Sequence, residues 1–132
     1  MATVSKQITY RDFDLRFIAH PITGKLNMLK NSHSVKQAVK NLILTNFYER
    51  PYAPLFGSGV RATLFENYTP HTQDDLEDAI TMALNNFEPR VELISIDFGG
   101  NPDLNQLSVS IVFRPINTVE AITLNLSLDR VR

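Results

Sequence analysis

Three neighbouring residues, Glu88, Pro89 and Arg90, are the ones whose types and spacing most suggest chemistry. They lie between a helix-like pattern and a strand-like pattern, so a carboxylate and a guanidinium flank a proline at a junction. Three interpretations are open. The residues form a turn with a local ion pair, a catalytic acid with an attendant cation, or a docking site for another protein.

The physical chemistry of this junction leaves the ion-pair and docking interpretations balanced. A carboxylate at Glu88 faces the negative end of the preceding helix, which costs ~0.3–1 kcal/mol. Pro89 fixes its own φ and extends the chain, so Glu88 and Arg90 can project to the same side. In one interpretation Arg90 neutralises Glu88 and bonds the last helix carbonyls. In the other, both charges are presented to a partner, where desolvated pairs give specificity.

Enzymatic chemistry has little support, and we assign no catalytic residue. The chain has no cysteine, and the serine of FGSGV belongs to a G-S-G turn and not to a nucleophile elbow. Glycoside hydrolysis needs only two carboxylates, about 5–10 Å apart. Three carboxylates stand in apolar or proline-containing surroundings and not in the acidic run: Glu49, Glu66 and Glu88. Glycoside hydrolysis with Glu66 or Glu88 as general acid is therefore the alternative function.

We expect no metal, cofactor or small-molecule ligand. The acidic run crowds the start of a predicted helix, where the positive end of the helix dipole favours anions: Asp74, Asp75, Glu77 and Asp78. Gly57 and Gly59 lack the preceding strand and the following Lys-Ser/Thr of a phosphate loop. The histidines are isolated from one another in the sequence: His20, His33 and His71.

Composition describes an ordinary globular protein of 132 residues, with 43% hydrophobic and 20% charged residues. The formal net charge of −1 gives no general reason to expect nucleic acid or an anionic membrane as partner. No apolar stretch approaches the ~20 residues of a membrane span. The N-terminus lacks a signal-peptide pattern, and the absence of cysteine fits assembly in a reducing compartment.

We expect one soluble domain over residues 1–132. Residues 1–20 have weak periodicity. They form either an arm that a partner orders or an ordinary strand or loop packed on its own domain.

Hydrophobic periodicity predicts an α+β fold, with helices packed on one face of a small antiparallel β-meander. The first helix lies in SHSVKQAVKNLILTN, with Ser32 or Ser34 as its cap. An irregular loop, ERPYAPLFGSG, and a short helix, VRATLFEN, follow. The next helix has Thr72 as N-cap and stops at Glu88, before the proline. Three strands complete the chain, RVELISIDF, QLSVSIVFR and AITLNLSL, joined by the turns GGNPDLN and PINT.

The order of the motifs is more informative than any one of them. The pattern L-x-T-x-x-G-E-R-x-x-x-x-x-F-G, then L-F-E, then E-P-R resembles the phage baseplate-wedge family typified by the T4 gene 25 product, which is shared with type VI secretion baseplates. The likeness runs from about residue 20 to about residue 130, and the matching residues are Leu42 or Leu44, Thr45, Glu49, Arg50, Phe56, Gly57, Leu64, Phe65, Glu66, Glu88, Pro89 and Arg90. One departure is Tyr48, where a glycine usually supplies a left-handed turn. The conformation of residues 46–50 is therefore open, with Asn46 as a possible substitute.

The resemblance implies a structural, non-enzymatic subunit of a contractile-tail baseplate, located in the phage virion and assembled in the host bacterial cytoplasm. It implies other wedge subunits and the tail sheath protein as partners. The family also carries a lysozyme label, which makes the alternative function a peptidoglycan-cleaving, lysozyme-like glycosidase acting in host entry. It favours docking for Glu88, Pro89 and Arg90. We expect a bracing role for the structural loop: Thr45, Glu49, Arg50, Pro51, Phe56 and Gly57.

The last predicted strand is a second candidate interaction site. No charge, proline or glycine interrupts it, although edge strands are normally blunted by such features. We expect an open edge to which a sheath protein adds a strand, unless residues 1–20 fold back and cover it. The interacting residues would be Ile122, Thr123, Leu124, Asn125, Leu126, Ser127 and Leu128.

Overall fold

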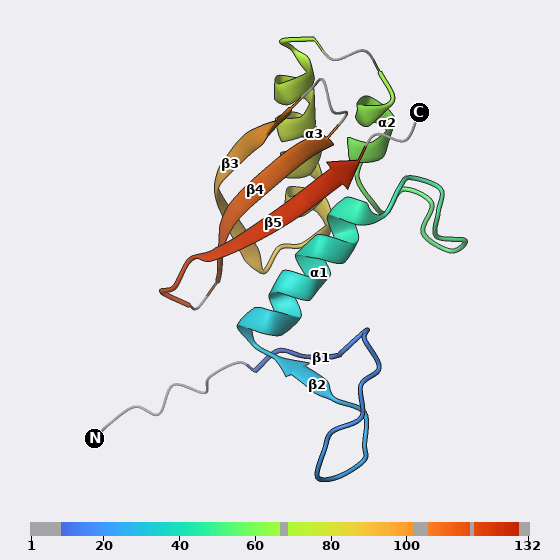
Figure 1. Cartoon of the computed structure of the whole chain (residues 1–132), viewed down its shortest axis with the longest axis vertical. Coiled ribbons are helices and arrows are strands. Elements are labelled where there is room, and N and C mark those ends of the chain that lie inside the picture. Colours follow the sequence, from blue (N-terminus) through green and yellow to red (C-terminus); the bar gives the residue numbers. More distant parts are fainter. Residues whose placement is uncertain (1–8, 67–68, 102–105, 117, 130–132) are drawn as a thin grey trace.

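The computed structural model describes residues 9–66, 69–101, 106–116 and 118–129. Its elements are shown in Figure 1. In chain order they are β1 (Arg11–Phe13), β2 (Met28–Lys30), α1 (Ser32–Leu44), α2 (Val60–Leu64), α3 (Thr72–Phe87), β3 (Val91–Asn101), β4 (Gln106–Pro115) and β5 (Ile122–Asp129).

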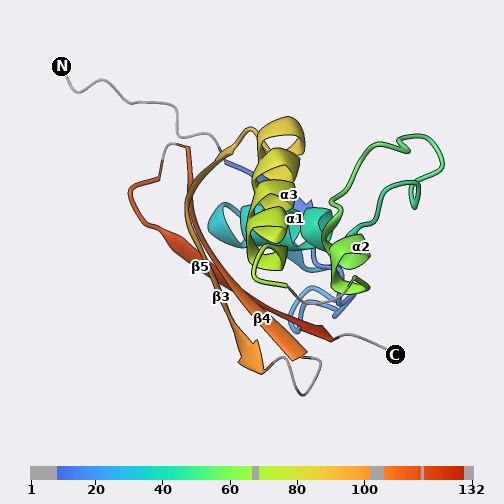
Figure 2. The same ribbon diagram turned by 90° about the horizontal axis from the view of Figure 1, so that it is seen from above.

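The predicted meander is confirmed. β3, β4 and β5 form an antiparallel sheet in that order, with β4 in the centre. Both α1 and α3 pack on the same face of this curved sheet (Figure 2), so the α+β prediction with helices on one face is also confirmed. The strands turn alternate side chains toward those helices, as the period-two pattern of the sequence requires.

The core lies between the helices and the sheet. α1 and α3 each contribute an apolar stripe at helical spacing, and β4 and β5 contribute every second residue. The buried hydrophobic residues are Val35, Val39, Leu42, Ile43, Val60, Leu76, Ile80, Ala83, Leu84, Val109, Ile111, Phe113, Leu124, Leu126 and Leu128. This packing fixes both ends of α3, and therefore the position of Glu88.

Both predicted helix caps were wrong. α1 begins after Asn31, which has a φ of 49° and donates its backbone N–H to the Tyr10 carbonyl at 2.8 Å. Its contact with the N-terminal segment sets the start of the helix, and Ser34 is buried inside the first turns. α3 starts one residue earlier than expected, with His71 as N-cap. The Thr72 hydroxyl accepts a hydrogen bond from the Thr69 N–H at 2.9 Å.

β3 differs from its sequence prediction in two ways. A register shift between Leu93 and Ser95 makes a β-bulge. Because the bulge adds one residue to the strand, the apolar side chains before and after it can both point toward the core. The strand also continues through the two glycines that we assigned to a turn. Gly100 has a φ of 119°, and a Cβ on it would lie 2.4 Å from the Gln106 carbonyl, so only glycine allows this close pairing. The remainder of the predicted turn, residues 102–105, lies outside the described part.

Residues 9–30 form a separate unit beside α1 (Figure 1). β1 pairs antiparallel with β2, and the Gln37 side chain of α1 donates to the Phe13 carbonyl at 2.9 Å. The turn before β2 closes through the Gly24 N–H, which donates to the His20 carbonyl at 2.9 Å. Residues 9–20 lie beside α1 in this structure, while residues 1–8 lie outside the described part.

Candidate functional site

The junction between α3 and β3 is built by local backbone constraints. Glu88 is the C-cap of α3, and its N–H donates to the Leu84 carbonyl at 2.9 Å. Pro89 ends the helix there, as predicted, because it disfavours helical geometry in the residue before it. The Val91 N–H then donates to the Glu88 carbonyl at 3.2 Å, which closes the turn into β3.

Glu88 and Arg90 form a bidentate ion pair within the chain. The Arg90 Nε donates to Glu88 Oε1 at 2.5 Å, and its Nη2 donates to Oε2 at 2.8 Å. The guanidinium also lies over the Tyr10 ring, 5.1 Å from its centroid. The hydrogen bonds to Glu88 raise the pKa of Arg90 above its usual value, against the opposing effect of burial. The pair is therefore an ion-pair brace between a helix end and a strand start.

The two partners differ in exposure. The Glu88 side chain is 8% exposed and that of Arg90 is 34% exposed, while Pro89 is open to solvent. A neighbouring protein could thus reach Pro89 and one side of the guanidinium, but not the Glu88 carboxylate. Both carboxylate oxygens are occupied by Arg90.

The loop that leaves α1 is held at both ends. The Ser58 N–H donates to the Thr45 carbonyl at 2.9 Å, which brings the last residues of the loop against its first ones. Glu49 accepts the backbone N–H of Asn46 at 2.8 Å, so its carboxylate closes a local turn. Pro51 lies on the exposed outer part of the loop.

The Phe-Gly pair anchors the same loop to α3. The Phe56 ring packs against Phe87, with 5.1 Å between ring centroids, and the Arg50 guanidinium lies 4.3 Å above Phe56. Gly57 has a φ of 135°, and a Cβ there would lie 2.5 Å from the Thr45 carbonyl oxygen. Only glycine fits this close approach, which explains the F-G motif in physical terms.

The edge predicted for the last strand is present. β5 pairs with β4 along one side, and β1 pairs with β2 instead of covering the other side. Within the described residues, the outer edge of β5 has no strand partner. Leu124, Leu126 and Leu128 point into the core, and the residues between them are exposed: Thr123, Asn125 and Ser127.

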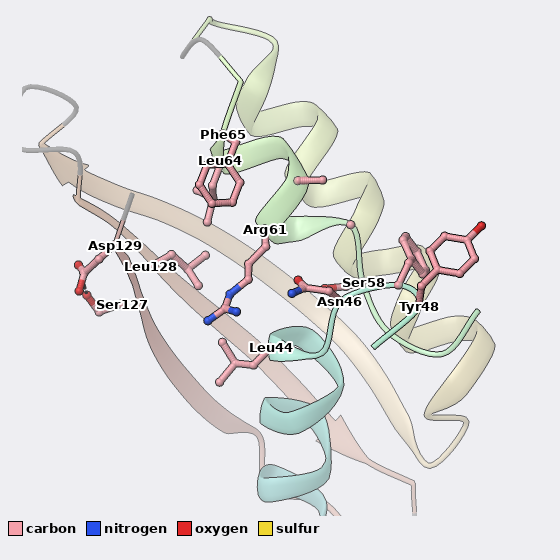
Figure 3. A pocket seen from close by; sticks show the side chains of 13 residues that line it. Leu44, Asn46, Tyr48, Ser58, Arg61, Leu64, Phe65, Ser127, Leu128 and Asp129 are labelled. Atoms are coloured by element: carbon pink, nitrogen blue, oxygen red, sulfur yellow. Dashed lines mark hydrogen bonds between the residues drawn. The ribbon is translucent and has the colours of Figure 1, made fainter. Parts of the chain in front are cut away.

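A cavity of about 840 Å³ adjoins the end of this strand (Figure 3). Leu44 of α1, Leu64 and Phe65 of the L-F-E motif, and Leu128 of β5 contribute to its wall. The Arg61 side chain extends from α2 into the space between Leu44 and Leu128. The L-F-E motif thus forms part of a partly apolar hollow that the sequence did not predict.

The candidate glycosidase carboxylates do not converge on a cleft. Glu66 is exposed just after α2, whereas Glu88 is buried behind Arg90. Neither lines the cavity of Figure 3. In the part of the chain that the structure describes, no three His, Cys, Asp or Glu side chains gather as a metal site, and no helix has the length and apolarity to cross a bilayer.

A second carboxylate–arginine pair was missed. Asp14 is buried and accepts from Arg16, with Nε–Oδ1 at 3.0 Å and Nη2–Oδ2 at 2.7 Å. The Arg16 side chain and backbone bonds lower the pKa of Asp14 to about 2, against the effect of burial. The acid-x-arginine spacing is the same as in Glu88-Pro89-Arg90, and that spacing was the signal that could have found it.

Comparison with known proteins identifies the family of this chain. A sequence model of the family described as baseplate wedge protein gp25 matches residues 30–118. The chain belongs to the gp25 family of baseplate wedge proteins. The baseplate wedge protein gp25 of Enterobacteria phage T4 is 35% identical over 97 residues, which cover 71% of this chain and 74% of that protein. The resemblance inferred from the motifs is therefore confirmed.

Solved structures share the fold. A putative tail lysozyme from Geobacter sulfurreducens has a TM-score of 0.68 at 23% identity, covering 74% of this chain and 89% of that chain. A chain of the anti-feeding prophage baseplate has a TM-score of 0.64 at 17% identity, covering 90% and 84%. A chain of the postcontraction pyocin R2 baseplate has a TM-score of 0.56 at 15% identity, covering 91% and 98%.

The departure from the gp25 family pattern at Tyr48 has a structural outcome. Tyr48 itself has a φ of 65°, so it adopts the left-handed conformation that a glycine would supply. Asn46 is not the substitute that we considered, because it is absent from the positive-φ residues of the described chain. The Tyr48 N–H donates to the Pro54 carbonyl at 2.7 Å, which holds this conformation in place.

Proposed function

We propose that this protein is a structural subunit of a contractile-tail baseplate wedge, where it docks to other wedge subunits and templates the first strands of the tail sheath. Membership of the gp25 family and the likeness to chains of two contractile baseplates support the baseplate role. The outer edge of β5, which no strand of the described residues covers, supports the templating role. The subunit would be assembled in the host bacterial cytoplasm and retained in the virion tail.

The β5 edge has the properties that strand addition requires. Seven consecutive residues, from Ile122 to Leu128, contain no charge, proline or glycine, so nothing in their side chains blocks an approaching strand. Their packing on α1 and β4 holds the edge in one position before any partner arrives. A sheath segment would extend the sheet through main-chain hydrogen bonds.

Proline substitution at the edge tests templating. Asn125→Pro removes one backbone N–H from β5, while Asn125→Ala at the same exposed position keeps it. We expect baseplates with either variant to assemble, but those with proline to carry bare tail tubes in electron micrographs. Thermal unfolding of both purified variants controls for damage to the β4–β5 pairing. Normal sheaths on baseplates that demonstrably contain the proline variant would overturn the templating role.

The Glu88–Arg90 pair would dock to a neighbouring wedge subunit through its exposed part. Glu88 orients the guanidinium, and Pro89 and Arg90 supply the contact surface. Arg90→Lys keeps the charge but loses the bidentate geometry, so it should reduce co-purification of wedge partners more than it reduces the melting temperature. Glu88→Ala and Arg90→Ala complete the comparison, with ~2–5 kcal/mol of binding expected to be lost for a buried interfacial pair. Both alanine variants also lose stability through the brace, so Arg90→Lys decides between the two roles. Equal losses of stability and of partner binding in Arg90→Lys would leave only the local brace.

The proposed role is non-enzymatic. We expect the purified protein to give no clearing on a peptidoglycan zymogram. Clearing that Glu66→Gln or Glu88→Gln abolishes would instead establish the lysozyme-like alternative.

A further inference from the structure

A groove of about 540 Å³ runs beside the unpaired edge of β5. Thr123, Leu124 and Asn125 line it, together with one face of α1 and part of the unit formed by residues 9–30. Successive strand side chains point to opposite faces of a sheet. A groove lined by three consecutive strand residues therefore reaches the strand edge itself. A strand added to β5 would lie in this groove, between β5 and α1.

The wall that α1 gives to this groove is polar and basic. His33, Lys36 and Lys40 recur at positions i, i+3 and i+7, so they share one helix face, opposite in character to the buried apolar stripe. Lys40 is exposed and Lys36 is partly exposed. Neither lysine makes an ion pair with another part of the chain that the structure describes.

The charge of the groove contrasts with that of the whole chain. Its lining contains three permanent cations, Arg16, Lys36 and Lys40, and one carboxylate, Asp14, which Arg16 neutralises. Three minus one leaves a local charge of +2 with His33 neutral, while the chain as a whole carries −1. The unmatched charges are the two lysines on the wall that an added strand would face.

We propose that the partner strand at the β5 edge is acidic, with carboxylates at the alternate positions that face Lys36 and Lys40. This inference rests on the proposed templating role of β5 and adds the chemistry of the segment that it selects. The main-chain edge supplies hydrogen bonds to any extended peptide, and the lysines of α1 discriminate among peptides by charge. A nucleic-acid phosphate would contact the lysines without hydrogen-bonding to the main-chain edge. Binding of that kind would not depend on the backbone N–H groups that the methylated peptides described below remove.

Short synthetic strands test the proposal on the full-length protein. The probes are peptides of about six residues, a common strand length, with glutamate, glutamine or lysine at alternate positions. Two exposed ion pairs of ~0.2–1 kcal/mol each predict that the glutamate peptide binds about 2- to 30-fold tighter than the glutamine peptide. This preference should weaken as salt is added. Shifts of the Thr123–Asn125 amides in NMR spectra would locate the binding.

Variants of the protein isolate the contribution of the groove. The double variant Lys36→Gln/Lys40→Gln should bind the glutamate and glutamine peptides equally. The control Lys25→Gln/Lys30→Gln removes the same charge outside the groove and should keep the preference. Equal binding of all peptides by the unaltered protein, or loss of the preference in the control, would overturn the acidic partner.

Methylated probes separate this proposal from the templating role. N-methylation of alternate peptide nitrogens blocks one hydrogen-bonding side of the strand, and methylation of the other set blocks the opposite side. We expect one set to abolish binding and the other to leave it nearly unchanged. If neither set matters, the edge does not template strands and the lysines bind anions in another way, which overturns both proposals. If one set matters but charge does not, templating survives and charge selection fails.

Discussion

Among the described residues, the same carboxylate–arginine pairing occurs in two regions, the N-terminal unit of residues 9–30 and the segment that contains α3 and β3. Glu88 and Arg90 join α3 to β3 inside the segment matched by the gp25 family, whereas Asp14 and Arg16 follow β1 outside it. Both pairs are bidentate, and both put the arginine two residues after a carboxylate that is almost fully buried. A bidentate pair by itself therefore does not indicate a docking site.

The two pairs differ in how each carboxylate is supported. Asp14 accepts from Arg16 through side chain and backbone, and from Asn27 Nδ2 at 3.4 Å. Glu88 receives its side-chain hydrogen bonds from Arg90. The Arg16 side chain is 69% exposed, against 34% for Arg90. The junction pair thus depends on its arginine for stability, while the N-terminal carboxylate has other donors and a more exposed arginine.

The largest expected effect is on stability when each arginine is removed. Arg90→Ala leaves Glu88 buried without its ion pair, so the free energy of unfolding should fall by ~2–4 kcal/mol. Arg16→Ala should cost less, because Asp14 keeps the Arg16 backbone N–H and Asn27. Urea denaturation of both variants measures the difference. An equal or larger loss for Arg16→Ala would show that the two pairs are supported alike.

A smaller effect, a gain in the free energy of unfolding, is expected at two aromatic residues with a left-handed backbone, one in each region. Phe17 follows Arg16 with a φ of 52°, and Tyr48 precedes Glu49 with a φ of 65°. Both side chains are largely exposed, so glycine loses little packing there and relieves ~1–2 kcal/mol of strain, less its own entropic cost.

Tyr48→Gly and Phe17→Gly should therefore each raise the free energy of unfolding by up to ~1 kcal/mol. Tyr48→Ala is the matched control, because alanine removes the ring but keeps the strain. A loss of stability in the glycine variant that exceeds the loss in the alanine variant would mean that the left-handed conformation is not costly here.

The smallest expected effect is a change in the stability of the fold at acid pH. The pKa of Asp14 is about 2 in the folded protein against an ordinary 3.8, so this carboxylate stabilises the fold fully above pH 4. That contribution is lost as the pH falls from 3.8 through 2. In Arg16→Ala the pKa of Asp14 should move up toward 3.8, which an NMR titration of its carboxyl carbon would show. An unchanged pKa would mean that Arg16 does not set it.

Sequence reasoning succeeded where the constraint is local. Pro89 ends α3 at Glu88 because of a steric effect between neighbouring residues, and strict alternation identified β4 and β5. It failed where the constraint comes from elsewhere in the fold. Asn31 starts α1 because it bonds Tyr10, and β3 continues through Gly100 because that residue lies against Gln106.

The candidate sites follow the same division. Neighbours in the sequence indicated the ion-pair interpretation of Glu88 and Arg90 and the uninterrupted run of β5, and the interaction roles of both stay predictions. The groove needed the structure, because it joins three segments that are far apart in the chain: residues 14–16, α1 and β5. Its one local signal was the spacing of His33, Lys36 and Lys40 on the polar face of a helix.

Amide hydrogen exchange along β5 tests the central claim most directly, in the free subunit and in baseplates with and without the first sheath ring. Antiparallel pairing with β4 uses only one side of the strand, so about every second amide between Ile122 and Asp129 should exchange rapidly in the free subunit. We expect those amides to become protected when the sheath ring is added. The outer edge of β3 serves as an internal reference. Rapid exchange of the same β5 amides in sheathed baseplates would contradict the claim that β5 templates the sheath.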